Sequence, residues 1–299
     1  MEFQIRTPGS TSNLGPGYDA LGLALTIYNH LAVQTRDTPG FQVAIEGEGQ
    51  HILDRDEGNL FYQAALFTAQ KMGKKLPGLS VQMENEVPLA RGLGSSSTAI
   101  VAGVIAANHV LDRPCSQQDL LNIATEIEGH PDNVSPCLLG GLAVSALEGK
   151  EVACIRVLPP PGLQTVVAIP QFELKTSEAR QVLPKEISLE DAVFGISRGC
   201  LLTAALMAGD FGKLKIGMQD RLHQPYRAHL IPNFYAVLDA AMAAGALGAA
   251  LSGAGPTLMA FANQNADAIG QAMVDTWQLK NIPATYHVLG IDTDGAVIL

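Results

Sequence analysis

The sequence is short of charged residues, aromatic residues and positive charge, and each shortage excludes a class of protein. Charged residues make up 16% and aromatic residues 5% of the 299 residues, and the formal net charge is −10. Soluble domains usually contain about 25% charged residues, so this chain is unusually rich in small apolar ones. Such a chain is too apolar to be disordered, and it lacks the basic surface of nucleic-acid-binding proteins. We expect a large folded core and no nucleic-acid partner.

Long apolar runs and paired cysteines are also missing. The longest apolar run, residues 99–107, falls well short of the roughly 20 residues that a spanning helix needs. The first residues show no basic segment that leads into an apolar run, as a signal peptide would. The four cysteines are scattered without a Cys-x-x-Cys pair, which argues against a zinc site or a disulfide scaffold. We expect a soluble cytoplasmic protein that does not contact a membrane.

The hydrophobic patterns predict an α+β protein with two domains. Strands are predicted at residues 31–35, 41–45, 79–84, 165–169, 249–251, 257–261 and 286–289. Helices are predicted at residues 60–72, 98–111, 117–128, 213–221, 233–244 and 267–277, and in the segment that follows Ser188. A Pro-rich joint at residues 159–162 separates two nearly equal halves. We place the domain boundary there, giving domains at residues 1–157 and 158–299.

The strongest motif is the Gly- and Ser-rich segment at residues 88–98, which leads into an apolar helix. A helix N-terminus carries a partial positive charge and free N–H groups, which suit an anion. Gly92 and Gly94 would allow close backbone approach, and the serines that follow add donors. The segment is neither a Walker A loop nor a dinucleotide fingerprint, because it lacks the Gly-Lys-Ser/Thr triplet and has Ser97 where Gly is required. It predicts a phosphate-binding loop; the alternative is an ordinary helix with a serine cap.

A second polar segment places Glu128, His130, Asp132 and Asn133 within six residues. Glu128 ends a predicted helix, where a carboxylate opposes the helix dipole. Binding of Mg²⁺, which prefers carboxylate and phosphate oxygens, would explain a carboxylate at this position. The alternative is a solvated turn that closes the helix, and a lone histidine such as His130 is more often structural than catalytic.

Two other glycine turns, at residues 12–19 and 251–256, are ordinary turns when each is taken alone. The first also presents Asn13 and Asp19 from a Gly-Pro-Gly loop. Polar side chains on such loops commonly act on ligands.

Four motifs together resemble one family. Residues 11–23 are similar to the N-terminal motif of homoserine kinases, and residues 88–98 resemble the ATP loop of the GHMP kinase superfamily. Residues 130–136 resemble the segment that these kinases place beside the acceptor hydroxyl, and residues 252–256 resemble the third motif of the superfamily. The resemblance extends over nearly the whole chain. It implies a ribosomal-protein-S5-like N-terminal domain and a ferredoxin-like C-terminal domain.

The resemblance also implies an activity: ATP-dependent phosphorylation of the side-chain hydroxyl of L-homoserine to O-phospho-L-homoserine, a step of threonine biosynthesis. It implies Mg²⁺ as cofactor and a homodimer as assembly. It assigns ATP binding to Asn59, Pro88, Leu89, Ala90, Arg91, Gly92, Leu93, Gly94, Ser95, Ser96, Ser97 and Thr98. It assigns Mg²⁺ to Ser96 and Glu128, and homoserine to Asn13, Asp19, His130, Thr176, Arg180 and Arg227.

The acceptor hydroxyl would lie beside Asn133, which cannot serve as a general base. We therefore expect an oriented hydroxyl to attack directly, with Asp132 as the alternative base. Homoserine is a zwitterion, so Asp19 would bind its ammonium and Arg180 and Arg227 its carboxylate. Placement on an exposed helix is the alternative for both arginines.

Two other functions stay open at this point. Another GHMP kinase, of the mevalonate or isoprenoid-precursor type, would act on a substrate without an α-ammonium, so Asp19 distinguishes it. A ligand sensor without catalytic activity could share the fold, and the intact Ser96 and Glu128 argue against it.

Overall fold

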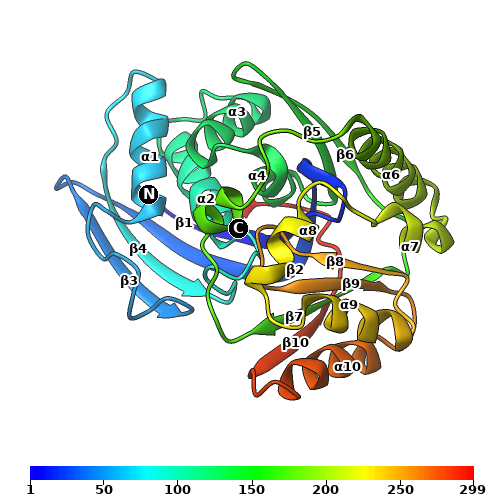
Figure 1. The fold of residues 1–299 in the computed structure, drawn as a ribbon. Helices are drawn as coiled ribbons and strands as arrows, with labels where there is room; N and C mark the ends of the chain where they lie inside the picture. The colour runs from blue at the N-terminus through cyan, green and yellow to red at the C-terminus, as the bar shows by residue number, and fades with distance from the viewer.

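The computed structural model describes residues 1–299 and contains two β-sheets with helices packed against them (Figure 1). The first part of the chain forms β1 (Glu2–Asn13), β2 (Gly17–Arg36), β3 (Phe41–Gly47), α1 (Leu60–Lys71), β4 (Gly78–Asn85), α2 (Ser95–Val110), α3 (Gln117–Glu128), α4 (Pro131–Leu139), β5 (Leu142–Glu148) and β6 (Glu151–Val157). The second part forms β7 (Gln164–Pro170), α5 (Thr176–Gln181), α6 (Leu189–Ala208), α7 (Leu214–Gly217), α8 (Gln224–Arg227), α9 (Phe234–Ala243), β8 (Gly248–Leu251), β9 (Leu258–Ala262), α10 (Ala266–Gln278), β10 (Ala284–Leu289) and β11 (Val297–Ile298). Single 3₁₀ turns lie at Phe211–Lys213 and Ala228–Leu230.

The first sheet has seven strands, and β2 is its central member. The order is β11-β1-β2-β4-β3, and β5 pairs with both β2 and β6. β2 is long enough to serve two neighbours: residues 21–23 pair with β5, and residues 29–36 pair with β4. β11 comes from the end of the chain and pairs with β1, so the last residues return to the first sheet.

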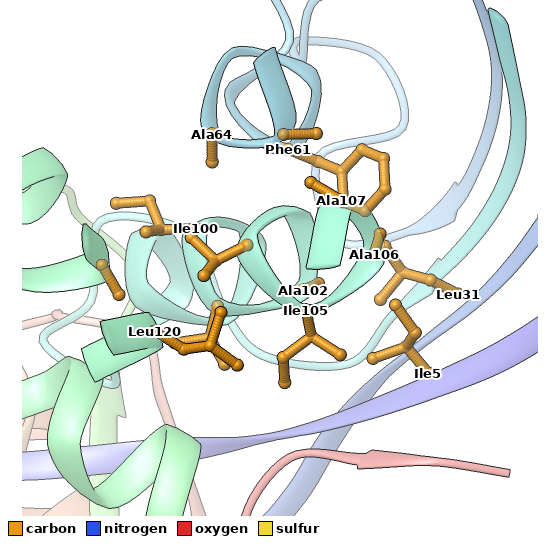
Figure 2. Close-up of a cluster of buried hydrophobic side chains, with 14 of the residues drawn as sticks. Ile5, Leu31, Phe61, Ala64, Ile100, Ala102, Ile105, Ala106, Ala107 and Leu120 are labelled. Atoms are coloured by element: carbon orange, nitrogen blue, oxygen red, sulfur yellow. The ribbon is translucent and has the colours of Figure 1, made fainter. Parts of the chain in front are cut away.

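Helix α2 lies at the centre of the first hydrophobic core. Eleven of its 16 residues are buried, which is the pattern of a helix that is covered on nearly all sides. Figure 2 shows it between α1, which carries Phe61 and Ala64, and the sheet residues Ile5 and Leu31. A Cβ on Gly103 would lie 2.2 Å from the carbonyl oxygen of Phe61, so the backbones of α1 and α2 approach closely. This packing fixes the direction in which the N-terminus of α2 points.

The second sheet has the order β10-β7-β9-β8 with antiparallel pairing throughout, and α9 and α10 pack against it (Figure 1). A separate cluster of 20 buried residues joins this sheet to the first. It includes Leu23 and Leu25 from β2, Val167 from β7 and Phe261 from β9. The two sheets therefore share a buried apolar interface.

The predicted α+β class is confirmed, whereas several elements differ from the prediction. The strand at 31–35 is only the end of the 20-residue β2. The helix predicted at 213–221 ends at Gly217, and residues 131–139, for which no helix was predicted, form helix α4. The predicted domain boundary lies between β6 and β7, and it stays a prediction.

Candidate active site

A cavity of about 530 Å³ is lined by residues from both parts of the chain. Most of the predicted site residues line it: Asn13, Asp19, Asn59, Leu89, Ala90, Arg91, Gly92, Gly94, Ser95, Ser96, Thr98, Glu128, His130, Asp132, Asn133, Thr176, Arg180 and Arg227. Pro88, Leu93 and Ser97 do not line it. Leu93 is fully buried in the cluster that joins the two sheets, so it anchors the loop from behind.

The predicted phosphate loop ends at an uncapped helix. Gly94 is the N-cap residue of α2, with φ 73°, and no side chain accepts a hydrogen bond from the first turn. The alternative of a serine-capped helix is therefore wrong. The first N–H groups of an α-helix have no partner within the helix, so they remain available to an anion.

The two loop glycines meet neighbouring protein segments at close range. A Cβ on Gly92 would lie 2.2 Å from the carbonyl oxygen of Ser252, and one on Gly94 would lie 2.2 Å from Oγ of Ser10. Ser252 Oγ also donates to the carbonyl oxygen of Gly92 at 2.6 Å. Packing of the loop against β1 and the β8–β9 turn is therefore a reason for glycine that the sequence did not reveal.

Glu128 faces the N-terminus of α2 from the end of α3. Ser96 Oγ donates to Glu128 Oε1 at 2.7 Å, and Ser97 Oγ donates to the same oxygen at 3.2 Å. The carboxylate opposes the dipole of its own helix but is stabilised by the positive end of α2. A hydroxyl and a carboxylate in contact are hard oxygen donors of the kind that Mg²⁺ prefers. The residues present therefore fit a magnesium ion.

At the other end of the cavity, the two residues predicted to bind opposite ends of homoserine bind each other. Arg180 donates to the carboxylate of Asp19 through Nη2 at 2.6 Å and Nη1 at 3.0 Å, and Nη1 also donates to the Tyr18 hydroxyl at 2.6 Å. Burial alone would lower the pKa of Arg180, but the hydrogen bonds to Asp19 together with the charges of Asp19 and its neighbours outweigh burial and raise that pKa. Neither residue lies on a freely exposed surface, and Tyr18 was not predicted.

The side chain of Asn133 is held from two directions. Its Oδ1 accepts from Ser10 Oγ at 2.9 Å, and its Nδ2 donates to Ser12 Oγ at 2.9 Å. The neighbouring Asp132 is 2% exposed and lies 2.6 Å from Nδ1 of His130. Burial lowers the pKa of His130, whereas the hydrogen bond and the charge of Asp132 raise it, with a net increase. Ser10 and Ser12 were missed, although the serines just before Asn13 were a visible signal.

Arg227 is almost completely buried, so the exposed-helix alternative is wrong for this residue. It is 1% exposed, and it donates to the carbonyl oxygens of Ala179 at 2.9 Å and Gly253 at 3.2 Å. Burial lowers its pKa. Its guanidinium links α5, α8 and the β8–β9 turn along one wall of the cavity.

Asn59 uses its side chain to hold the local fold. Its Oδ1 caps α1 by accepting from the Phe61 N–H at 3.1 Å, and its Nδ2 donates to the Asp54 carbonyl at 2.7 Å. The residue lines the cavity where the resemblance places adenine. Its contacts order the loop before α1.

The comparisons with known proteins agree on one family. Residues 59–141 match the family "GHMP kinases N terminal domain", and residues 202–278 match "GHMP kinases C terminal". The homoserine kinase of Moorella thermoacetica is 44% identical over 99% of both chains. That of Carboxydothermus hydrogenoformans is 46% identical over 99% of this chain and 96% of its own.

A solved structure supports the same conclusion. The homoserine kinase of Cytophaga hutchinsonii superposes with a TM-score of 0.91 at 31% identity, covering 100% of this chain and 97% of that one. The similarity thus extends across both sheets and the cavity between them. The chain belongs to the homoserine kinases, within the GHMP kinase superfamily.

Proposed function

We propose that the protein transfers the γ-phosphoryl group of ATP to the side-chain hydroxyl of L-homoserine, which forms O-phospho-L-homoserine for threonine biosynthesis. The observation that carries the proposal is a single cavity that joins the uncapped N-terminus of α2 to the Asp19–Arg180 pair. The first end suits phosphate groups, and the second offers opposite charges to a zwitterion.

Homoserine would bind by separating the existing charge pair. Its ammonium takes the place of Arg180 against Asp19, and its carboxylate takes the place of Asp19 against Arg180. Each charge then keeps a partner of opposite sign, which avoids a buried unpaired charge. Arg227, His130, Asn13 and Thr176 line the same end of the cavity and complete the proposed pocket.

The hydroxyl would be oriented by Asn133 and attack the γ-phosphorus directly. The acceptor oxygen–phosphorus bond forms while the β,γ-bridging bond breaks, and its electron pair leaves with ADP. The hydroxyl proton passes to an oxygen of the transferred phosphoryl group. Oδ1 of Asp132, the alternative base, already lies 2.6 Å from Nδ1 of His130, which supports a positioning role for Asp132. Positioning and charge stabilisation supply most of the catalysis of phosphoryl transfer.

Ser96 and Glu128 would hold Mg²⁺. When bound, the ion supplies positive charge that offsets the charge on the phosphate oxygens. Glu128 faces the N-terminus of α2, where the nucleotide phosphates are expected, so a cation is needed to offset the repulsion between the carboxylate and the phosphates.

We propose that the protein is cytoplasmic and forms a homodimer through the outer face of α6 (Figure 1). Leu189 is 81% and Ile196 68% exposed, and Val193 and Met207 continue the same helical stripe. By length and composition alone, α6 could also span a membrane. The ion pairs of Glu190 and Asp191 with Arg221 flank this face, and burying them in lipid would be costly, so a second copy of α6 is the favoured partner.

Sedimentation velocity tests the dimer. The wild type should sediment as a dimer, and Ile196→Glu should give a folded monomer. A monomeric wild type, or a wild type that binds to lipid vesicles, would contradict this assembly.

The activity is tested by measuring ADP release with homoserine, mevalonate and galactose as acceptors. Release that depends on homoserine alone supports the proposal. Release with mevalonate alone would indicate the isoprenoid-precursor alternative, and no release with any acceptor would indicate the sensor.

A further inference from the structure

The lining of the cavity is poor in positive charge for a site that binds a polyphosphate. Its carboxylates belong to Asp19, Asp54, Glu128, Asp132 and Glu173. Its permanent cations belong to Arg91, Lys175, Arg180 and Arg227. Five carboxylates thus face four permanent cations, so a cation without a partner in the protein is important for binding a ligand that carries several negative charges.

Three of the four cations already have partners. Arg180 forms the bidentate pair with Asp19. Arg227 is buried and donates to backbone carbonyls on two sides. Arg91 donates to the Leu89 carbonyl at 3.2 Å, and it lies 3.7 Å from the carboxylate of Glu173.

Lys175 is the remaining cation, and its side chain makes no hydrogen bond or ion pair. Its backbone is nevertheless fixed beside the phosphate loop, because the N–H of the preceding Leu174 donates to the Ala90 carbonyl at 3.5 Å. The side chain of Leu174 is buried, with 6% exposed, and this burial anchors the contact. Thr176 and Arg180 follow on α5 and reach the acceptor end. Lys175 therefore lies between the loop that would hold the phosphates and the pocket that would hold the acceptor.

We propose that Lys175 is a catalytic residue whose ammonium contacts the γ-phosphoryl group of ATP during transfer. This inference rests on the proposed function. The 88–98 loop contains no lysine, unlike a Walker A loop, and its one cation, Arg91, is already held by Leu89 and Glu173. A cation that is free to contact the γ-phosphoryl group therefore has to come from another segment. A lysine is a compact charge on a flexible stem that can follow the phosphoryl group as its bond to the β-phosphate breaks and its bond to the acceptor oxygen forms. The ammonium keeps its protons throughout and offsets the charge on the phosphoryl oxygens.

Lys175→Met removes the charge and keeps most of the side-chain length. We expect kcat to fall by about 100-fold, the usual effect of removing one group that stabilises transition-state charge. Calorimetry should show weaker binding of a non-hydrolysable ATP analogue and unchanged binding of ADP, because only the former has a γ-phosphoryl group. Lys175→Arg should restore part of the rate. Lys185→Met, an exposed lysine outside the cavity, is the matched control and should behave like the wild type.

A kcat for Lys175→Met within threefold of the wild type would overturn the inference. So would an equal loss of affinity for ADP and the analogue, because the contact would then lie elsewhere on the nucleotide. If the wild type does not phosphorylate homoserine, yet Lys175→Met selectively weakens the analogue, the proposed function fails while the contact stands.

Discussion

The two ends of the cavity differ in the chemical groups that form them. The phosphate end is formed mainly by one continuous segment, in which a glycine turn leads into the backbone N–H groups of α2, and Glu128 faces it from α3. The acceptor end is formed by charged side chains from distant segments, such as Asp19 and Arg180, which are 161 residues apart. The N–H groups at the phosphate end are positioned by local folding and by the packing of α2 in the core. The charged side chains at the acceptor end are positioned by their ion pair with each other.

This difference predicts how each end responds to substitution. Removing one charge at the acceptor end leaves its partner half-buried without compensation, which is more costly than losing a single neutral hydrogen bond. The phosphate end distributes its contacts over several N–H groups, so no single side chain there carries the whole interaction. The largest effects on substrate use are therefore expected at the acceptor end.

Asp19→Asn is expected to have the largest effect. It keeps the size of the side chain and removes the charge that would bind the homoserine ammonium. Truncating a desolvated charge pair costs about 2–5 kcal/mol, so kcat/KM for homoserine should fall roughly 30- to 4000-fold. ATP affinity measured without acceptor should stay near the wild-type value.

N-acetyl-homoserine, which carries no ammonium, is the matched substrate control. It should be a poor substrate of the wild type, and Asp19→Asn should discriminate against it less. If the wild type phosphorylated both acceptors equally well, the ammonium would not be recognised and the two ends of the cavity would be less different than proposed.

Glu128→Gln is expected to have a smaller effect than Asp19→Asn, and it acts at the phosphate end, where it removes the charge that would anchor Mg²⁺. Turnover should fall by more than about tenfold, and half-maximal activity should require more Mg²⁺. Glu126→Gln is the control: Glu126 lies on the same helix and forms ion pairs with Lys71 and Lys150 outside the cavity. A turnover within about threefold of the wild type, equivalent to ~0.7 kcal/mol, would mean that Glu128 only ends its helix.

Gly94→Ala tests whether packing fixes the phosphate loop. Gly73 is a matched control with a similar positive φ of 64° and no atom within 4 Å of an added Cβ. Gly73→Ala should cost only the backbone strain, about 1–2 kcal/mol. Gly94→Ala should cost more in thermal unfolding and also weaken ATP binding, because its Cβ displaces Ser10. Equal losses in the two variants would show that the contact with Ser10 does not matter.

The phosphate end was predictable from sequence because its signal is local. Glycines, serines and the apolar helix follow one another in the chain, and the capping box of Ser116 and Asp119 is equally local. The pairing of Asp19 with Arg180 was not predictable, because it depends on how the two sheets pack. The sequence indicated which charges a zwitterion needs, and it could not indicate that those charges neutralise each other.

Two elements were missed for a different reason, because their local sequence patterns are misleading. β1 alternates between exposed and buried residues only over Glu2–Arg6, and its second half, which contains Pro8 and Gly9, is buried throughout and lacks the alternation that marks a half-buried strand. Its pairing with β2 also shifts register between Pro8 and Ser10. Helix α4 was missed because its polar first turn resembles a loop, although Pro131 at its first position is a recognised helix start.

The smallest expected effect concerns pH and the buried charges beside the acceptor end. His223 is fully buried, with Nε2 2.7 Å from the Gly15 carbonyl and Nδ1 3.2 Å from Arg227. Burial lowers its pKa below the ordinary 6.5, Arg227 lowers it further, and Asp220 partly offsets both. As pH falls below about 6.5, the unfolded chain binds a proton that the native ring does not, so stability decreases until the lower native pKa is reached.

His223→Gln removes this titration and can still donate to the Gly15 carbonyl. Its free energy of unfolding should therefore decrease less steeply between neutral and mildly acidic pH, by up to about 1.4 kcal/mol for each pH unit. His229→Gln, at an exposed histidine of the same segment, is the control and should keep the wild-type slope. Denaturant unfolding at a series of pH values gives the free energy of unfolding of all three proteins. Parallel curves of unfolding free energy against pH for the wild type and His223→Gln would mean that the folded protein binds a proton at His223 as readily as the unfolded chain does. The contrast between the backbone groups of the phosphate end and the charged groups of the acceptor end would then not extend to stability.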